Sequence, residues 1–223
     1  DGAAKEASFD KPSGVVVDGS GNVYVGDGDN HRIRKITQEG VVSTVAGGAK
    51  GGPKSIAHAL QGAVVGKKAC FNRPRGLAVD KGGNIYVSDK LNHAIRKVTP
   101  DGVVDTIAGS GKPDFADGEG LAASFNRPHG VAVDESGNIY VADSGNNRIR
   151  KITASGNVMT FAGSGIEGNA DGLGKEASFN QPHSVAIDGS GNVYVADKQN
   201  NSIRKISPSG TVTTLAGSGK PEF

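Results

Sequence analysis

The sequence repeats one pattern of short strands and tight turns four times. Each copy opens on a proline, and these prolines lie 62, 54 and 54 residues apart: Pro12, Pro74, Pro128 and Pro182. Short runs of β-branched and aromatic residues alternate with glycine-rich turns, without the i, i+3, i+4 apolar spacing of an amphipathic helix. A period of this length built from strands is typical of the blades of a β-propeller.

The third copy shows how one unit is built. The pattern predicts four strands joined by glycine-containing turns, at 130–134, 139–142, 148–152 and 157–163. The first is apolar throughout, which suits an innermost strand with both faces buried. We therefore expect an all-β propeller built from four-stranded antiparallel blades, at approximately 12–47, 73–109, 127–163 and 181–217.

One connection departs from the repeat. Residues 49–69, between the first two blades, form a longer inserted connection and include His58. Insertions in repeat proteins map to loops, often on the binding face, so His58 is a candidate loop residue of a binding site; a short helix packed on the blade edge is the alternative. Because each blade contacts only its neighbours, residues 1–223 are expected to form a single domain.

The repeat resembles the NHL family of β-propellers. The third copy runs Pro-His-Gly-Val-Ala-Val-Asp, then Gly-Asn-Ile-Tyr-Val-Ala-Asp, then Arg-Ile-Arg-Lys-Ile, and the Asn-His pair that names the family is present as Asn30-His31 and Asn92-His93. The resemblance covers nearly the whole chain and implies a propeller, usually of six blades. It leaves the function open, because the family includes RNA-binding domains, kinase sensor domains, secreted scaffolds and a zinc-dependent lyase.

The two ends of the chain fall at the same place in the repeat. Lys220-Pro221 matches Lys112-Pro113, and Asp1-Gly2 matches Asp117-Gly118. This fits part of a larger ring, a closed four-bladed ring, or a ring completed by a second copy; the family resemblance favours the first. An open segment exposes apolar blade faces, so we expect further blades or self-association to cover them.

A phenylalanine stands three residues before every opening proline: Phe9, Phe71, Phe125 and Phe179. A large ring at a fixed repeat position is expected to be buried between adjacent blades.

The mouth of the central channel is the candidate ligand site. The residues that follow the opening prolines lie where the inner strands converge: Ser13, Arg75, His129 and His183. Paired imidazoles are zinc ligands, and the resemblance implies a comparison with the family's peptidyl-hydroxyglycine lyase, whose zinc histidines stand in Pro-His-Gly or Pro-His-Ser contexts. Ser13 and Arg75 depart from that pattern. We therefore expect no cofactor, with zinc at His129 and His183 as the alternative.

Charge gives little support to nucleic-acid binding. The chain has 25 Lys and Arg against 23 Asp and Glu, a net charge of +2. Arg-Lys pairs recur on the third strands, but adjacent strand residues point to opposite faces, and Asp27, Asp89, Asp143 and Asp197 recur as acidic partners. Exposed aromatic residues for base stacking are not interleaved with them, so an RNA-binding NHL domain is a weaker alternative.

No phosphate loop or nucleophile elbow occurs in the sequence. We expect a non-catalytic binding or scaffolding module that presents its loops and central channel to a protein or small ligand. The sequence contains no run of 18 apolar residues, so it does not predict a membrane-spanning segment. The single Cys70 excludes an internal disulfide and leaves the compartment open, with an extracytoplasmic or secreted location favoured.

Overall fold

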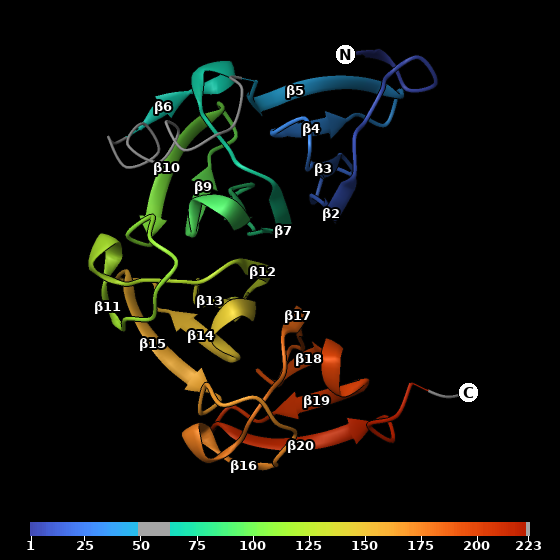
Figure 1. Ribbon diagram of the computed structural model, residues 1–223. Helices are drawn as coiled ribbons and strands as arrows, with labels where there is room; N and C mark the ends of the chain where they lie inside the picture. Colours follow the sequence, from blue (N-terminus) through green and yellow to red (C-terminus); the bar gives the residue numbers. More distant parts are fainter. Residues whose placement is uncertain (49–62, 222–223) are drawn as a thin grey trace.

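Four β-sheets follow one another along an open arc in the computed structural model, which describes residues 1–48 and 63–221 (Figure 1). Blade 1 comprises β1 (Gly2–Ala3), β2 (Pro12–Val17), β3 (Val23–Asp27), β4 (Arg32–Ile36) and β5 (Val41–Gly47). Blade 2 comprises β6 (Val64–Val65), β7 (Pro74–Val79), β8 (Ile85–Asp89), β9 (Ala94–Val98) and β10 (Val103–Ala108). Blade 3 comprises β11 (Gly118–Glu119), β12 (Pro128–Val133), β13 (Ile139–Asp143), β14 (Arg148–Ile152) and β15 (Asn157–Ala162). Blade 4 comprises β16 (Gly172–Leu173), β17 (Pro182–Ile187), β18 (Val193–Asp197), β19 (Ser202–Ile206) and β20 (Thr211–Ala216).

Each blade contains one more strand than the repeat predicts. In blade 3 the order is β11-β15-β14-β13-β12, with every pair antiparallel. The added strand, β11, has two residues and pairs with the outer edge of β15. It comes from the connection before the blade, so the connection covers an edge that would otherwise be unpaired.

Short 3-10 turns complete the repeat. One follows the added strand in three blades: η1 (Gly66–Lys68), η3 (Gly120–Ala122) and η5 (Gly174–Glu176). Another joins the second and third long strands: η2 (Lys90–Asn92), η4 (Ser144–Asn146) and η6 (Lys198–Asn200). None of these described helices is long or apolar enough to cross a membrane.

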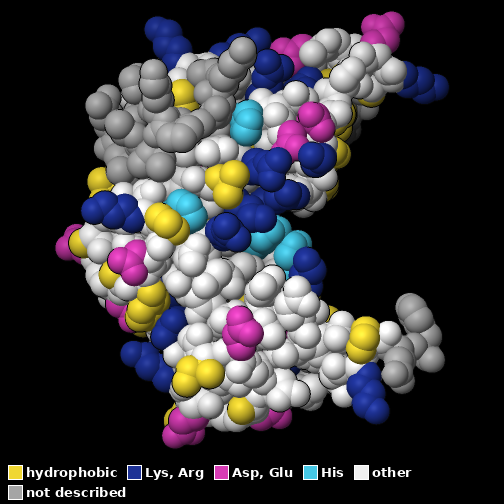
Figure 2. Space-filling model, in the orientation of Figure 1, with side chains coloured by type: hydrophobic (Ala, Val, Ile, Leu, Met, Phe, Trp, Pro, Cys, Tyr) yellow, Lys and Arg dark blue, Asp and Glu magenta, His cyan; other side chains and the backbone are white. Residues whose placement is uncertain are grey.

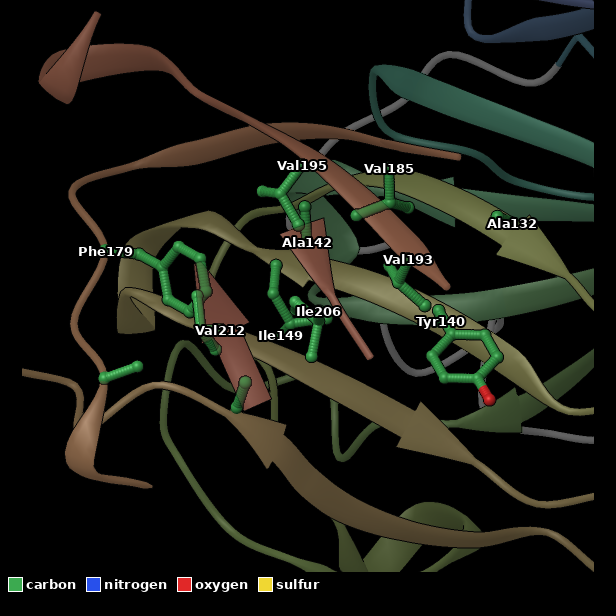
Figure 3. Close-up of a cluster of buried hydrophobic side chains, with 12 residues drawn as sticks. Ala132, Tyr140, Ala142, Ile149, Phe179, Val185, Val193, Val195, Ile206 and Val212 are labelled. Carbon is green, nitrogen blue, oxygen red and sulfur yellow. The ribbon is translucent and has the colours of Figure 1, made fainter. Parts of the chain in front are cut away.

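The hydrophobic core lies between blades rather than within them. Figure 3 shows the cluster between blades 3 and 4, in which Phe179 lies among Ile149 of blade 3 and Val212 of blade 4. The prediction for the repeated phenylalanine is confirmed at Phe71, Phe125 and Phe179, which are fully buried. Phe9 is only half-buried, because no described blade precedes it.

A buried ion pair crosses each blade. The arginine of each third strand and the aspartate that ends each second strand are fully buried: Arg34–Asp27, Arg96–Asp89, Arg150–Asp143 and Arg204–Asp197. Their closest N–O distances are 2.9 to 3.1 Å. The arginines are therefore neutralised inside the blades, and they do not form a basic surface.

Glycines let the inner strands approach one another. β2, β7, β12 and β17 pack in succession along the concave side. A Cβ on Gly76 would lie 2.3 Å from the carbonyl oxygen of His129, and one on Gly130 would lie 2.7 Å from Cα of Ser184. Only glycine allows this approach, which brings the residues after the prolines close together.

The two ends of the arc expose residues that are buried elsewhere in the repeat. Val15 in β2 is 60% exposed, whereas the matching Val131 is 5% exposed. Ile203 in β19 is 41% exposed, whereas Ile149 is fully buried. Blades 1 and 4 lie at opposite ends of the arc, so the described residues do not close into a four-bladed ring (Figure 1).

Candidate functional site

The structure brings the four residues predicted at the channel mouth together. Ser13, Arg75, His129 and His183 line one cavity of about 140 Å³ on the concave side. The rings of His129 and His183 are stacked, with centroids 3.7 Å apart and planes 36° apart. Ser13 Oγ donates a hydrogen bond to the carbonyl oxygen of Arg75, 3.2 Å away. The remaining candidate, His58, lies outside the described residues.

A second, adjoining cavity of about 330 Å³ contains residues that the sequence analysis missed. Together the two cavities form the channel mouth. The second is lined by Arg75, His129 and His183, and also by Lys90, Arg127, Ser144 and Lys198. Lys90, Ser144 and Lys198 are the first residues of η2, η4 and η6. Each follows the buried aspartate of its blade, and the repeat has Gly28 at the same position in blade 1. This position and the one after it vary between the copies, while the Asp before them and the Asn after them are constant, which was the available signal.

Arg127 is held at the mouth by the preceding blade. Its backbone is left-handed, with φ of 52°, and its N–H donates to Nδ1 of His93 at 3.1 Å. The same bond joins Arg73 to His31 at 3.2 Å and Gln181 to Asn147 at 2.9 Å. The second residue of the Asn-His pair, or its Asn replacement, is therefore a link between blades.

The first residue of that pair acts within its own blade. The Nδ2 atoms of Asn92 and Asn146 each donate to the buried aspartate of the blade at 2.8 Å. These bonds compensate the buried carboxylate and fix the turn that carries the mouth residues.

The mouth is cationic. Figure 2 shows Lys and Arg side chains gathered with His side chains on the concave side of the arc. Burial, followed by the charges of Arg75 and Arg127, lowers the pKa of Lys90. Burial also lowers the pKa of His129 to about 3, with a further contribution from His183. Burial, followed by the charge of Lys198, lowers the pKa of His183. At neutral pH the imidazoles are therefore uncharged.

The mouth residues do not fit a three-histidine zinc site. No group of three or more His, Cys, Asp or Glu side chains gathers anywhere in 1–48 and 63–221. The rings of His129 and His183 lie against each other at a tilt of 36°, and Arg75 lines the same cavity. A catalytic zinc takes three protein ligands, of which the described mouth supplies two at most.

A larger cavity of about 880 Å³ lies between blades 1 and 2, and its lining includes Asp1, Arg32 and Lys67. The segment that follows Gly48 lies outside the described residues.

The NHL-repeat family model matches four segments of the chain: residues 9–36, 71–98, 125–152 and 179–206. Each segment holds the first three long strands of one blade. The chain therefore belongs to the NHL-repeat family of β-propeller proteins.

Similar proteins are mostly longer. Protein SUPPRESSOR OF QUENCHING 1, chloroplastic, of Arabidopsis thaliana is 28% identical over 240 residues, covering 100% of this chain and 22% of that protein. NHL repeat-containing protein 2 of Bos taurus is 30% identical over 256 residues, covering 98% of this chain and 34% of that protein. A streptogramin B lyase structure superposes with a TM-score of 0.65 and 16% identity, over 96% of this chain and 57% of that chain. The last likeness shows a shared fold alone.

Proposed function

We propose that this chain is a non-catalytic binding module whose channel mouth holds a small ligand or a segment of a protein. The central observation is where the four repeats differ. The residues after the prolines and the first residues of the 3-10 turns vary between blades, and they line the mouth. The buried positions of the same strands keep one residue type or a close equivalent.

The constant positions and the variable positions therefore have different roles, the first in folding and the second in recognition. Positions that hold the blade together are constrained in the same way in every copy, so they stay alike. Two of the varying side chains, Ser13 and Ser144, donate hydrogen bonds to backbone carbonyls of the next blade. Arg75, Lys90 and Lys198 form no ion pair with an acid in the described residues, and they line a cavity to which several blades contribute side chains. Convergent polar groups at a cavity are the usual setting for a ligand.

Two features support binding without catalysis. No carboxylate is hydrogen-bonded to His129 or His183 among the described residues that line the mouth, whereas such a partner orients a catalytic histidine. Glu167, the acidic residue that lines the mouth, is exposed. RNA binding is also less supported, because no Phe, Tyr or Trp lines the mouth for base stacking.

The test is a screen of small molecules against the isotope-labelled chain by NMR, with neutral, cationic and anionic compounds in equal number. Binding at the mouth is expected to shift the backbone amides of Gly76, Gly130 and Ser144 and to leave the outer strands unchanged. Hits that gather on the outer connections, or no hits at all, would contradict the proposal.

Zinc is tested separately by metal analysis of the purified chain. Stoichiometric zinc that disappears in a His129→Ala/His183→Ala variant would replace this proposal with a metalloenzyme.

A further inference from the structure

The basic residues of the channel mouth form no ion pairs within the described residues. Arg75, Lys90, Arg127 and Lys198 line the cavity of about 330 Å³, and none forms an ion pair with an acid in the described parts of the chain. Elsewhere the opposite holds, since the four strand arginines are paired with buried aspartates. Glu167 also lines this cavity but is exposed, so the mouth carries an excess of positive charge.

The contrast is sharpest at the residues before the opening prolines. Lys11 and Arg73 both pair with Asp29, at 2.5 and 2.9 Å. Arg127 occupies the same repeat position, but Leu91 and Gly145 stand where Asp29 stands in blade 1. Blade 1 thus carries the neutralising acid, and blades 2 and 3 lack it.

Partial burial makes this arrangement costly for the fold. Nε of Arg75 is buried without a hydrogen-bond partner. Lys90 is half-buried, and burial together with neighbouring arginines lowers its pKa. Clustered like charges without partners destabilise a folded chain, and such conflicts gather at functional sites.

Resting on the proposed function, we infer that the channel mouth binds a small anion with at least two negative charges, carried on phosphate or carboxylate oxygens. Arg75 and Lys90 contact it from blade 2, Arg127 from blade 3 and Lys198 from blade 4. A cavity of about 330 Å³ is near the lower limit for small-molecule sites, so the anion is compact. Oxyanions are the acceptors that guanidinium and ammonium groups bind most strongly.

The experiment is calorimetric titration at low ionic strength with pyrophosphate and, separately, citrate. Acetate and methyl phosphate serve as weakly charged comparisons. Three forms of the chain are used: wild type, Arg75→Ser/Lys90→Ser, and Lys112→Ser/Lys175→Ser. The two substituted forms lose the same charge, but Lys112 and Lys175 are exposed in the outer connections. The serines follow the chain's own repeats, Ser13 and Ser144.

We expect saturable binding of pyrophosphate, citrate or both to wild type, weakened about tenfold or more in the mouth variant and unchanged in the control. The preferred anion distinguishes a phosphate from a carboxylate ligand. Equal weakening in both variants, or no binding to wild type, would overturn the inference. Neutral compounds alone bound at Gly76 and Gly130 would overturn it while the proposed function stands. A single-stranded RNA oligonucleotide that binds more tightly than either anion, and loses affinity in the mouth variant, would replace it with nucleic-acid recognition.

Discussion

Nδ1 of His93 accepts a hydrogen bond from the backbone N–H of Arg127, 3.1 Å away in the next blade. His93 is buried and Arg127 begins the segment that enters the channel mouth, so one side chain joins two blades and positions a basic residue. The NHL pair is therefore structural, and its effect on the site passes through the backbone.

Replacing His93 tests this link. We expect His93→Leu to lower the free energy of unfolding by about 1 to 2 kcal/mol, because the N–H of Arg127 loses its acceptor. His93→Asn should lose less, since Asn147 Oδ1 accepts the same bond from Gln181 at 2.9 Å. Urea unfolding measures both, and equal losses would contradict the link.

The repeated phenylalanine gives a matched pair of positions. Phe125→Ala is expected to lower the free energy of unfolding by about 3 to 5 kcal/mol, because a fully buried ring is deleted between blades. Phe9→Ala should cost less than half as much, since Phe9 is half-buried at the open end. Denaturant titration of both variants provides the comparison, and similar losses would show that Phe9 is covered in solution.

Most of the fold could be predicted from the sequence because turns, strands and buried rings recur in the same order four times. The two-residue outer strands could not, since a pair such as Gly118–Glu119 is too short to show alternation. For the site, the residue after each proline was found because it lies on an inner strand. Lys90, Arg127 and Lys198 were missed because only the path of the 3-10 turn and a left-handed residue bring them to the channel.

Blade 2 lacks an acid that the other blades have. The Nη2 atoms of Arg34, Arg150 and Arg204 reach Asp1, Asp117 and Asp171 at 2.7 to 3.1 Å. Ala63 stands at this position in blade 2, and Nη2 of Arg96 is buried without a hydrogen-bond partner.

Ala63→Asp is therefore expected to raise the free energy of unfolding by about 1 kcal/mol, as a charge-assisted bond forms at a partly exposed carboxylate. The midpoint of thermal unfolding of Ala63→Asp is compared with that of wild type, and Ala63→Asn is the uncharged control. A midpoint unchanged or lowered by the aspartate would contradict the argument.

Lowering the pH should reduce the free energy of unfolding, because His129 has a lowered pKa in the folded state. The folded-state pKa of His129 is about 3, lowered first by burial and then by His183, Lys90, Arg75 and Lys198. The unfolded chain has an ordinary histidine pKa of about 6.5, so as pH falls below that value only the unfolded state takes up the proton. The stability conferred by this lowered pKa is therefore lost between about pH 6.5 and pH 3.

From pH 7 to pH 4.5 this loss is expected to be about 2 kcal/mol for His129. His129→Gln removes the titrating group, so its free energy of unfolding should decline less steeply over the same range. Urea titrations at both pH values measure the slopes, and parallel declines would contradict the pKa assignment.

The basic residues of the channel mouth are expected to serve a ligand rather than the fold. The most direct test of this claim is the free energy of unfolding of Arg75→Ser/Lys90→Ser in low salt without ligand. We expect a gain of about 0.5 to 1 kcal/mol over wild type, diminishing as salt screens the repulsion between the remaining cations. A loss of more than about 1 kcal/mol, the scale of a structural hydrogen bond, would show that these residues hold the blades together and would contradict the claim.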